Sequence, residues 1–299
     1  MSVVGQSLKK RQQVWLPWLT LAVLAVVWGS SFILIKRGLT VFSAGEVGAL
    51  RIVSAALFLM PVAAPKLRNL SRRQMIILLI IGFVGSFIPA FLFATAQTSI
   101  SSSLTGILNA LTPLCTLLLG AAFFSKPITS KNGIGLGIGF IGSIILIIGG
   151  THSGVGEINL YGLLVIGATI CYGFNLNIIK NYTPELHPVV ITSVSLLFVG
   201  PLALGYLFGF TAFTEHVQQP SAFWPLMALI ALGVVGTALA LILFNKMVQM
   251  KTAVFASSVT YIIPIVAVIW GVLDGEALSA YHFAGMAAIL GGVYVANRL

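Results

Sequence analysis

Two short stretches of the sequence place polar side chains inside apolar runs. Residues 26–36 read VVWGSSFILIK and residues 170–180 read ICYGFNLNIIK. When the two stretches are aligned with an offset of 144 residues, each has an aromatic residue, a glycine and a lysine at the same positions. Hydroxyl, amide and indole groups in hydrocarbon need hydrogen-bonding partners, so they tend to face a bundle interior or a cavity. In a cavity, a ring supplies an apolar wall and the smaller groups supply directed hydrogen bonds to a ligand. The pattern therefore indicates binding of a small molecule.

The candidate cavity residues in these stretches are Trp28, Ser30, Ser31, Tyr172, Asn175 and Asn177. Asn175 and Asn177 are two positions apart, about 200° around a helix, so they cannot both face one point. The competing interpretation is that the hydroxyls and amides hold neighbouring helices together. Lys36 and Lys180, which end the two stretches, are expected to mark the membrane interface.

Two prolines, Pro113 and Pro264, lie in the middle of apolar runs. A proline inside a helix lacks a backbone donor and frees the carbonyl four residues earlier, here those of Asn109 and Thr260. Kinks at corresponding places in two halves of a chain predict bending gates, with the freed carbonyls near a substrate path. A static kink is the alternative. Polar residues in the same neighbourhood are Ser257, Ser258 and Tyr261.

Arg51 is the basic residue deepest in an apolar run. It could bind an anionic group such as a substrate carboxylate, and a structural partner or a snorkelling side chain is the alternative. Acidic pairs at helical spacing are missing from the apolar runs, and the four histidines are scattered over different connectors. Cys115 and Cys171 lack metal-ligand spacing. We therefore expect no enzyme activity, disulfide, metal or cofactor, and no proton coupling through a carboxylate at the membrane centre.

The composition requires a lipid environment. The 299 residues are 58% hydrophobic and 7% charged, whereas soluble domains carry about 25% charged residues. The net charge of +10 resides in short connectors between apolar runs rather than in a stripe on a polar face. This distribution points to anionic lipid headgroups of a bilayer and not to nucleic acid as the counter-charge.

The apolar runs predict ten transmembrane helices, because a helix needs roughly 20 apolar residues to cross the hydrocarbon. They are expected at residues 14–35, 45–64, 75–94, 103–124, 133–150, 160–179, 188–210, 224–245, 253–273 and 281–297. The first run lacks a small-residue cleavage site and is interpreted as a retained span. Residues 1–13 are expected to form a disordered cytoplasmic tail.

The connectors predict the orientation. With the N-terminus inside, thirteen of the 16 basic residues lie on the cytoplasmic side, as the positive-inside rule requires. We expect a multi-pass protein of the bacterial inner membrane with both termini in the cytoplasm.

An internal repeat explains the matching stretches. Residues 82–93 (GFVGSFIPAFLF) overlay residues 233–244 (GVVGTALALILF) with an offset of 151, and the match continues to Pro113 on Pro264. When one residue is removed from the first copy, the alignment continues further and places Lys126 on Glu276. Residues 14–150 and 160–298 are expected to be two copies of a five-helix unit. Because five is odd, the second copy enters the membrane inverted, so the expected fold is an all-α bundle of two inverted repeats, common among secondary transporters.

These features together resemble the EamA family of the drug/metabolite transporter superfamily. The similarity consists of W-G-S-S-F with a following lysine, ALRIVSAALF around Arg51, G-x-x-G in the third and eighth spans, the two prolines, and VLDGEALSAYHFAGMAAILGGV near the end. The resemblance implies transport of small organic molecules, often outward, through a cavity between spans 1–4 and 6–9, with spans 5 and 10 peripheral. One departure is Lys126, which replaces an acidic residue frequent in the family.

The expected function is export of amino acids or similar amphipathic metabolites by alternating access around this cavity. A flippase that moves lipids or polyisoprenoid-linked molecules on the same fold is the alternative function. An integral membrane enzyme is a weaker alternative. Small residues four apart in the fifth span (Gly133, Gly135, Gly137 and Gly139) predict close helix packing, with a homodimer as the other interpretation.

Overall fold

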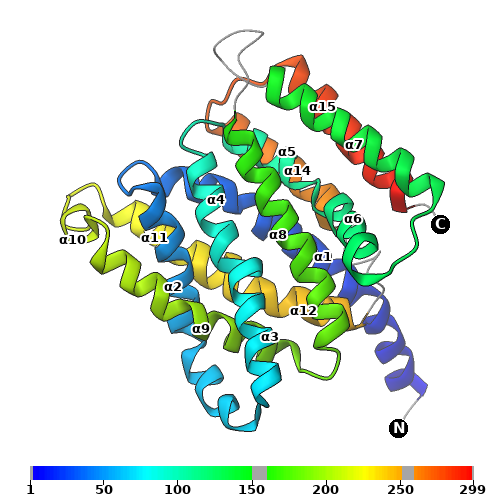
Figure 1. Ribbon diagram of the computed structural model, residues 1–299, viewed down its shortest axis with the longest axis horizontal. Coiled ribbons are helices and arrows are strands. Elements are labelled where there is room, and N and C mark those ends of the chain that lie inside the picture. The colour runs from blue at the N-terminus through cyan, green and yellow to red at the C-terminus, as the bar shows by residue number, and fades with distance from the viewer. Residues whose placement is uncertain (1–2, 150–159, 251–258, 298–299) are drawn as a thin grey trace.

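The computed structural model describes residues 3–149, 160–250 and 259–297, and in these ranges every regular element is a helix. Figure 1 shows the helices packed side by side in one bundle. Their bounds are α1 Val3–Gly38, α2 Ala44–Ala63, η1 Ala64–Asn69, α3 Arg72–Gly82, η2 Phe83–Phe87, α4 Ile88–Ala96, α5 Ser102–Asn109, α6 Thr112–Phe124, α7 Ser130–Gly149, α8 Tyr161–Tyr182, α9 Pro188–Gly209, α10 Phe213–His216, α11 Phe223–Gly233, η3 Val234–Leu239, α12 Ala240–Met250, α14 Val259–Leu273 and α15 Ala280–Asn297.

Eight helical stretches are long and apolar enough to cross a membrane. They are Trp18–Gly38, Ala44–Asn69, Arg72–Ala96, Ser102–Phe124, Ser130–Ile148, Tyr161–Tyr182, Pro188–Gly209 and Phe223–Val248. Two shorter apolar helices, Val259–Leu273 and Ala280–Ala296, follow them. Each stretch coincides with one of the predicted apolar runs, and the predicted all-helical class is confirmed for the described residues.

The N-terminal tail differs from the prediction. Helix α1 begins at Val3, so the described residues before position 14 are helical and not disordered. The reason is local: residues 6–16 contain no glycine or proline and include lysine, arginine and glutamine, which favour a helix. Nothing in this segment stops the first span from extending beyond the apolar run.

Large apolar side chains cover the outer surface of the bundle. Phe123 is 67% exposed, Trp224 is 77% exposed, and many leucines and isoleucines are more than one-third exposed. A water-soluble protein rarely exposes so much contiguous apolar surface. This surface is suited to contact with lipid acyl chains.

A π-helical turn interrupts two helices at corresponding places. The turns η2 and η3 begin at positions 83 and 234, which are 151 residues apart, as in the sequence repeat. The glycine before each turn permits a close helix contact, because a Cβ at Gly82 would meet the Ser195 carbonyl and one at Gly233 would meet the Arg51 carbonyl. Turns of this kind are frequent at functional sites.

The prolines behave differently in the two halves. Helix α5 ends at Asn109 and α6 begins at Thr112, so Pro113 lies in the first turn of a new helix and not in the middle of a kinked one. A proline is tolerated there because its missing donor would have no partner in any case. Pro264 lies inside α14, as predicted. The prediction of two equivalent kinks is therefore wrong for Pro113.

Helices α7 and α15 lie along each other at one edge of the bundle (Figure 1). A Cβ at Gly135 would meet the Gly292 carbonyl, and one at Gly142 would meet the Gly285 carbonyl. The glycines of the fifth span thus bring two backbones together within the chain. By contrast, Cβ atoms at Gly133 and Gly137 would meet no atom of the described part of the chain within 4 Å, and the homodimer stays a prediction.

Candidate substrate cavity

A cavity of about 420 Å³ lies inside the bundle. Its walls come from both halves of the chain: α1, α2, α3, η2, α4, α5 and α6 from the first, and α8, α9, η3, α12 and α14 from the second. The described residues of α7 and α15 contribute nothing to the lining, which agrees with the peripheral position that the resemblance implies. A space of this size is suited to a small organic molecule.

Trp28 connects the two halves across the cavity. Its indole Nε1 donates to the Gly236 carbonyl in η3 at 3.0 Å, and its ring packs against Phe244 with centroids 5.0 Å apart. Ser31 also lines the cavity, with its hydroxyl donating to the Val27 carbonyl at 3.1 Å. Of the polar groups of the first stretch, the indole and one hydroxyl therefore reach the cavity.

Ser30, the second predicted serine, lies outside the lining. Its hydroxyl donates to the Val26 carbonyl at 2.7 Å and accepts from the Trp270 indole at 2.8 Å. It therefore joins α1 to α14, which is the alternative interpretation given for these hydroxyls.

Tyr172 and Arg51 form the polar centre of the cavity. The Tyr172 ring stacks on Phe93 with centroids 5.9 Å apart, and its hydroxyl lies beside the Arg51 guanidinium. Arg51 Nε donates to the Thr237 hydroxyl at 2.9 Å. Within the described part of the chain, Arg51 forms no ion pair with a carboxylate. A partly buried guanidinium without an acidic partner retains the capacity to bind an anionic group.

Asn177 and Asn175 both line the cavity but have different partners. Asn177 Oδ1 accepts from Lys126 Nζ at 2.8 Å, and its amide nitrogen donates to the Thr116 and Gly173 carbonyls. Asn175 lies against Gly85 of η2, and its Oδ1 is buried without a hydrogen-bond partner among the described residues. An unsatisfied buried acceptor is costly, so Asn175 is a candidate contact for a substrate N–H or O–H group.

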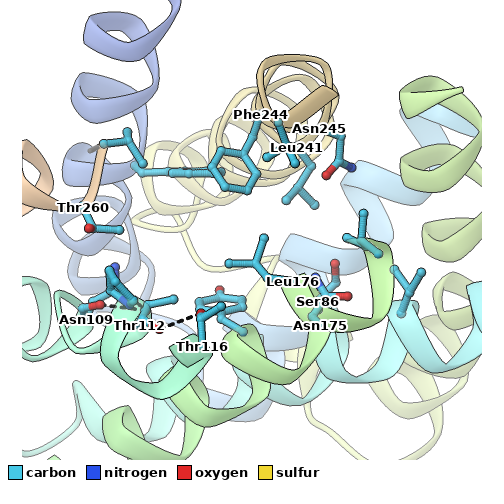
Figure 2. A pocket seen from close by; sticks show the side chains of 18 of the residues that line it. Ser86, Asn109, Thr112, Thr116, Asn175, Leu176, Leu241, Phe244, Asn245 and Thr260 are labelled. Carbon is cyan, nitrogen blue, oxygen red and sulfur yellow. Dashed lines mark hydrogen bonds between the residues drawn. The ribbon is translucent and has the colours of Figure 1, made fainter. Parts of the chain in front are cut away.

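Figure 2 shows polar side chains on α5 and α6 facing α12, which presents Phe244 and Leu241 together with Asn245. Asn109, Thr112 and Thr116 lie along the wall formed by α5 and α6. The Asn109 carbonyl, predicted to be freed by the proline, accepts from the Thr112 hydroxyl at 2.8 Å. Phe244 and Leu241 lie opposite them. One wall thus offers hydroxyls and amides, and the other offers apolar contact and one amide.

The remaining predicted residues divide between the lining and its surroundings. Thr260 and Pro113 line the cavity, whereas Tyr261 and Pro264 do not. Tyr261 packs against the neighbouring core. Ser257 and Ser258 lie outside the described residues.

The prediction missed several polar lining residues, namely Ser86, Thr112, Thr116, Thr192, Ser195, Thr237 and Asn245. The repeat contained a signal for two of them. Ser86 and Thr237 occupy the same place, 151 residues apart, directly after the glycines of the two π-helical turns.

Charged residues mark the two ends of the span Ser102–Phe124. At one end the cavity lining includes Lys126, Pro127 and Lys180, of which the last two are exposed, so the cavity meets the surface there. We call this the Lys126 end. The opposite end holds an ion-pair cluster made of Lys36, Arg37, Asp274 and Glu276.

The ion-pair cluster joins three segments of the chain. Lys36 Nζ lies 2.5 Å from Asp274 Oδ2 and 2.9 Å from Glu276 Oε1, and Arg37 also pairs with Asp274. Glu276 accepts hydrogen bonds from the backbone and hydroxyl groups of Ser102 and Ser103, at 2.6 to 3.0 Å. It therefore connects the end of α1, the start of α5 and the loop after α14.

The pKa of Glu276 reflects these contacts. Burial disfavours the charged carboxylate, but the hydrogen bonds from Ser103, Lys36 and Ser102 outweigh burial and lower its pKa from 4.5 to about 2. Glu276 is therefore ionised at neutral pH, and its negative charge holds this end of the bundle together.

A bundle of membrane-spanning helices around a partly polar cavity is the architecture of a transport protein. The EamA-like transporter family matches residues 16–148 and 159–298, and the chain belongs to this family. An "Uncharacterized transporter YetK" of Bacillus subtilis (strain 168) is 28% identical over 76% of this chain and 69% of its own length.

Further relatives cover nearly the whole chain. A "Probable amino-acid metabolite efflux pump" of Salmonella typhimurium is 25% identical over 91% of this chain and 92% of its own length. An "Uncharacterized inner membrane transporter YedA" of Escherichia coli (strain K12) is 24% identical over 90% and 87%. A crystal structure aligns with a TM-score of 0.63 at 14% identity, covering 93% of this chain and 95% of the other, and shares the fold.

Proposed function

We propose that the protein is a secondary transporter of the bacterial inner membrane that exports small amphipathic metabolites, such as amino acids or their derivatives, by alternating access. The observation that carries this proposal is one cavity built from both halves of the chain, open at the Lys126 end and closed by ion pairs at the opposite end. Such an arrangement gives a bound molecule access from one side of the membrane at a time.

The mechanism rests on ten spans arranged as two inverted five-helix repeats. The π-helical turns at a spacing of 151 residues support this arrangement, as does the pairing of Ser86 with Thr237 in the lining. The two shorter apolar helices would supply the ninth and tenth spans. With this symmetry, the second conformation resembles the first with the roles of the halves exchanged.

The positive-inside rule places the Lys126 end in the cytoplasm. The observed state would then be open to the cytoplasm, where an exporter loads its substrate. The ion-pair cluster would lie on the outer side and would have to separate before release.

The two walls of the cavity suit an amphipathic substrate. Trp28, Phe93, Phe244 and Tyr172 supply aromatic surface, and Asn175 and Arg51 supply directed polar contacts. The described part of the lining contains no acidic side chain. Exchange of substrates without a coupled proton is consistent with such a lining.

Counterflow in liposomes tests the proposal. Vesicles loaded with a mixture of unlabelled amino acids and their N-acetyl derivatives should accumulate labelled phenylalanine or N-acetylphenylalanine, with and without a pH gradient. Trp28→Ala and Tyr172→Ala should abolish accumulation, whereas Trp224→Ala, which removes an outward-facing ring, should not. Failure of both labelled compounds to accumulate through folded protein would reject this substrate class, and a flippase of lipid-linked molecules would be tested next.

A further inference from the structure

The connectors after α6 and α14 fold back onto corresponding glycines. The amide of Lys126 donates to the Gly120 carbonyl at 3.1 Å, and the amide of Glu276 donates to the Gly271 carbonyl at 2.8 Å. Gly120 and Gly271 are the glycines that the repeat aligns. The first hydrogen bond joins residues six apart and the second joins residues five apart, so the two connectors end their helices in a similar way, with one extra residue in the first.

The residue before each charged side chain confirms the equivalence. Ser125 has φ of 52° and Gly275 has φ of 80°. Left-handed backbone is unfavourable for a residue with a Cβ, yet the first connector adopts it with a serine. Lys126 and Glu276 therefore occupy the same structural position in the two halves.

The facing residues are equivalent as well, because the repeat aligns Lys36 with Lys180. At one end, Lys36 meets Glu276 at 2.9 Å, and opposite charges close the bundle. At the Lys126 end, the same two positions hold Lys180 and Lys126, which are both positive. The structure shows no carboxylate within ion-pair distance of either lysine in the described ranges.

The two lysines influence each other in the observed state. Both line the cavity, and Lys126 Nζ donates to the neutral amide of Asn177 at 2.8 Å. Burial and the nearby charge of Lys180 lower the pKa of Lys126. Bringing the lysines closer, as closure of this end requires, increases their repulsion.

We propose that the transported substrate is an organic anion, and that its negative group supplies the acid missing from the Lys126 end and permits this end to close. The proposal rests on the transport function proposed above and specifies its substrate class. Arg51, the other cation of the cavity, also favours an anion. Asn175 Oδ1 can accept a hydrogen bond from an amide N–H of the substrate. An amphipathic carboxylate without a free ammonium group fits these contacts.

Three compounds with one skeleton test the substrate class in the counterflow assay. N-acetylphenylalanine, phenylalanine and phenylalanine amide carry net charges of −1, 0 and +1 at about pH 6, which is below the pKa of the α-amino group, and each has an N–H donor. We expect the acetylated anion to be exchanged at least about tenfold faster than the other two, since one added ion pair is readily equivalent to such a factor. Lys126→Gln should reduce the preference, and Lys131→Gln, at an exposed residue in the first turn of α7, should not.

The conformational part of the proposal has an independent test. Leu117 lines the cavity, so a Leu117→Cys variant with Cys115→Ala and Cys171→Ala reports access through the Lys126 end to an impermeant thiol reagent. N-acetylphenylalanine should protect this cysteine. Lys126→Glu should protect it without substrate, because a glutamate there can pair with Lys180.

The outcomes separate the two proposals. Exchange of phenylalanine as fast as its acetylated form would overturn the anion proposal and leave the transport function standing. Exchange of none of the three would overturn both for this class of compound. The role assigned to Lys126 would be overturned if the cysteine were labelled at the same rate in three proteins: Lys126→Glu, Lys131→Glu and the background without either substitution.

Discussion

Glu276→Gln is expected to loosen the end of the bundle that the ion-pair cluster closes. The substitution keeps the size of the side chain but removes the negative charge of the carboxylate. This carboxylate pairs with Lys36 and accepts hydrogen bonds from Ser102 and Ser103. The lowering of the pKa from 4.5 to about 2 corresponds to about 3 kcal/mol in favour of the ionised form. Screening by solvent at this loop reduces this free energy to about 2 kcal/mol. The population of molecules that are open at the end closed by the ion-pair cluster should therefore rise about thirtyfold.

Thiol labelling measures this change directly. Ile35 precedes Lys36, lines the cavity and is 1% exposed, so an Ile35→Cys substitution in a background without native cysteines should be labelled slowly from this side. Glu276→Gln should accelerate labelling. Glu215→Gln is the matched control, because Glu215 is an exposed acid that forms no ion pair with another described residue. Equal labelling rates in the two variants would refute the role of the ion-pair cluster.

Acid should have the same effect as the substitution. Because the folded-state pKa of Glu276 is depressed, its contribution to closure is complete above about pH 4.5 and is lost as the pH falls towards about 2. The labelling rate of the Ile35→Cys protein, divided by that of the same protein carrying Glu276→Gln at the same pH, should therefore rise in this window, because the ratio cancels the loss of thiolate in acid and the titration of Asp274.

Three further outcomes follow from individual contacts. Trp28→Phe removes one hydrogen bond to a carbonyl of η3 and should cost about 1 kcal/mol, seen as a lower melting temperature in detergent. Gly173→Ala would place a Cβ against the backbone of α6 and should cost about 2 kcal/mol, whereas Gly205→Ala, where that position is open, should be tolerated. Because burial and Lys180 lower the pKa of Lys126 below 10.5, exchange of anionic substrate should decline as the pH rises towards that value, and Lys126→Arg should remove the decline.

Hydropathy was sufficient to place the helices. In the described residues eight of the apolar runs coincide with membrane-length helical stretches and the last two contain shorter apolar helices, because the length of the hydrocarbon and the need to satisfy backbone groups allow few alternatives. Trp28 and Tyr172 were also predictable, since large amphipathic rings at equivalent places in two helices favour a shared interior. Of the glycines predicted to pack closely in the fifth span, Gly135 and Gly139 do so, whereas Gly133 and Gly137 have no close neighbour among the described residues.

Contacts between distant segments could not be predicted in this way. Lys36 and Glu276 are 240 residues apart, and the repeat aligns each with its counterpart but says nothing of which helix ends face each other. The same limitation applies to Ser30, whose hydroxyl could have pointed to the cavity or to α14. The break before Pro113 was missed because an isolated proline predicts a kink and a new first turn equally well.

The difference between Lys126 and Glu276 makes the two halves of the protein unequal. If the equivalent positions carried equivalent charges, closure of either end would involve similar interactions, and neither conformation would be favoured. Here one end closes through the protein's own ion pairs, while the other brings two lysines together. An empty protein should therefore rest with the Lys126 end open, and a bound anion should be needed to leave that state. On this reasoning, the empty carrier returns readily to the Lys126-open state after it has released an anion, whereas closing the Lys126 end without a bound anion is slow, so net export is faster than net uptake.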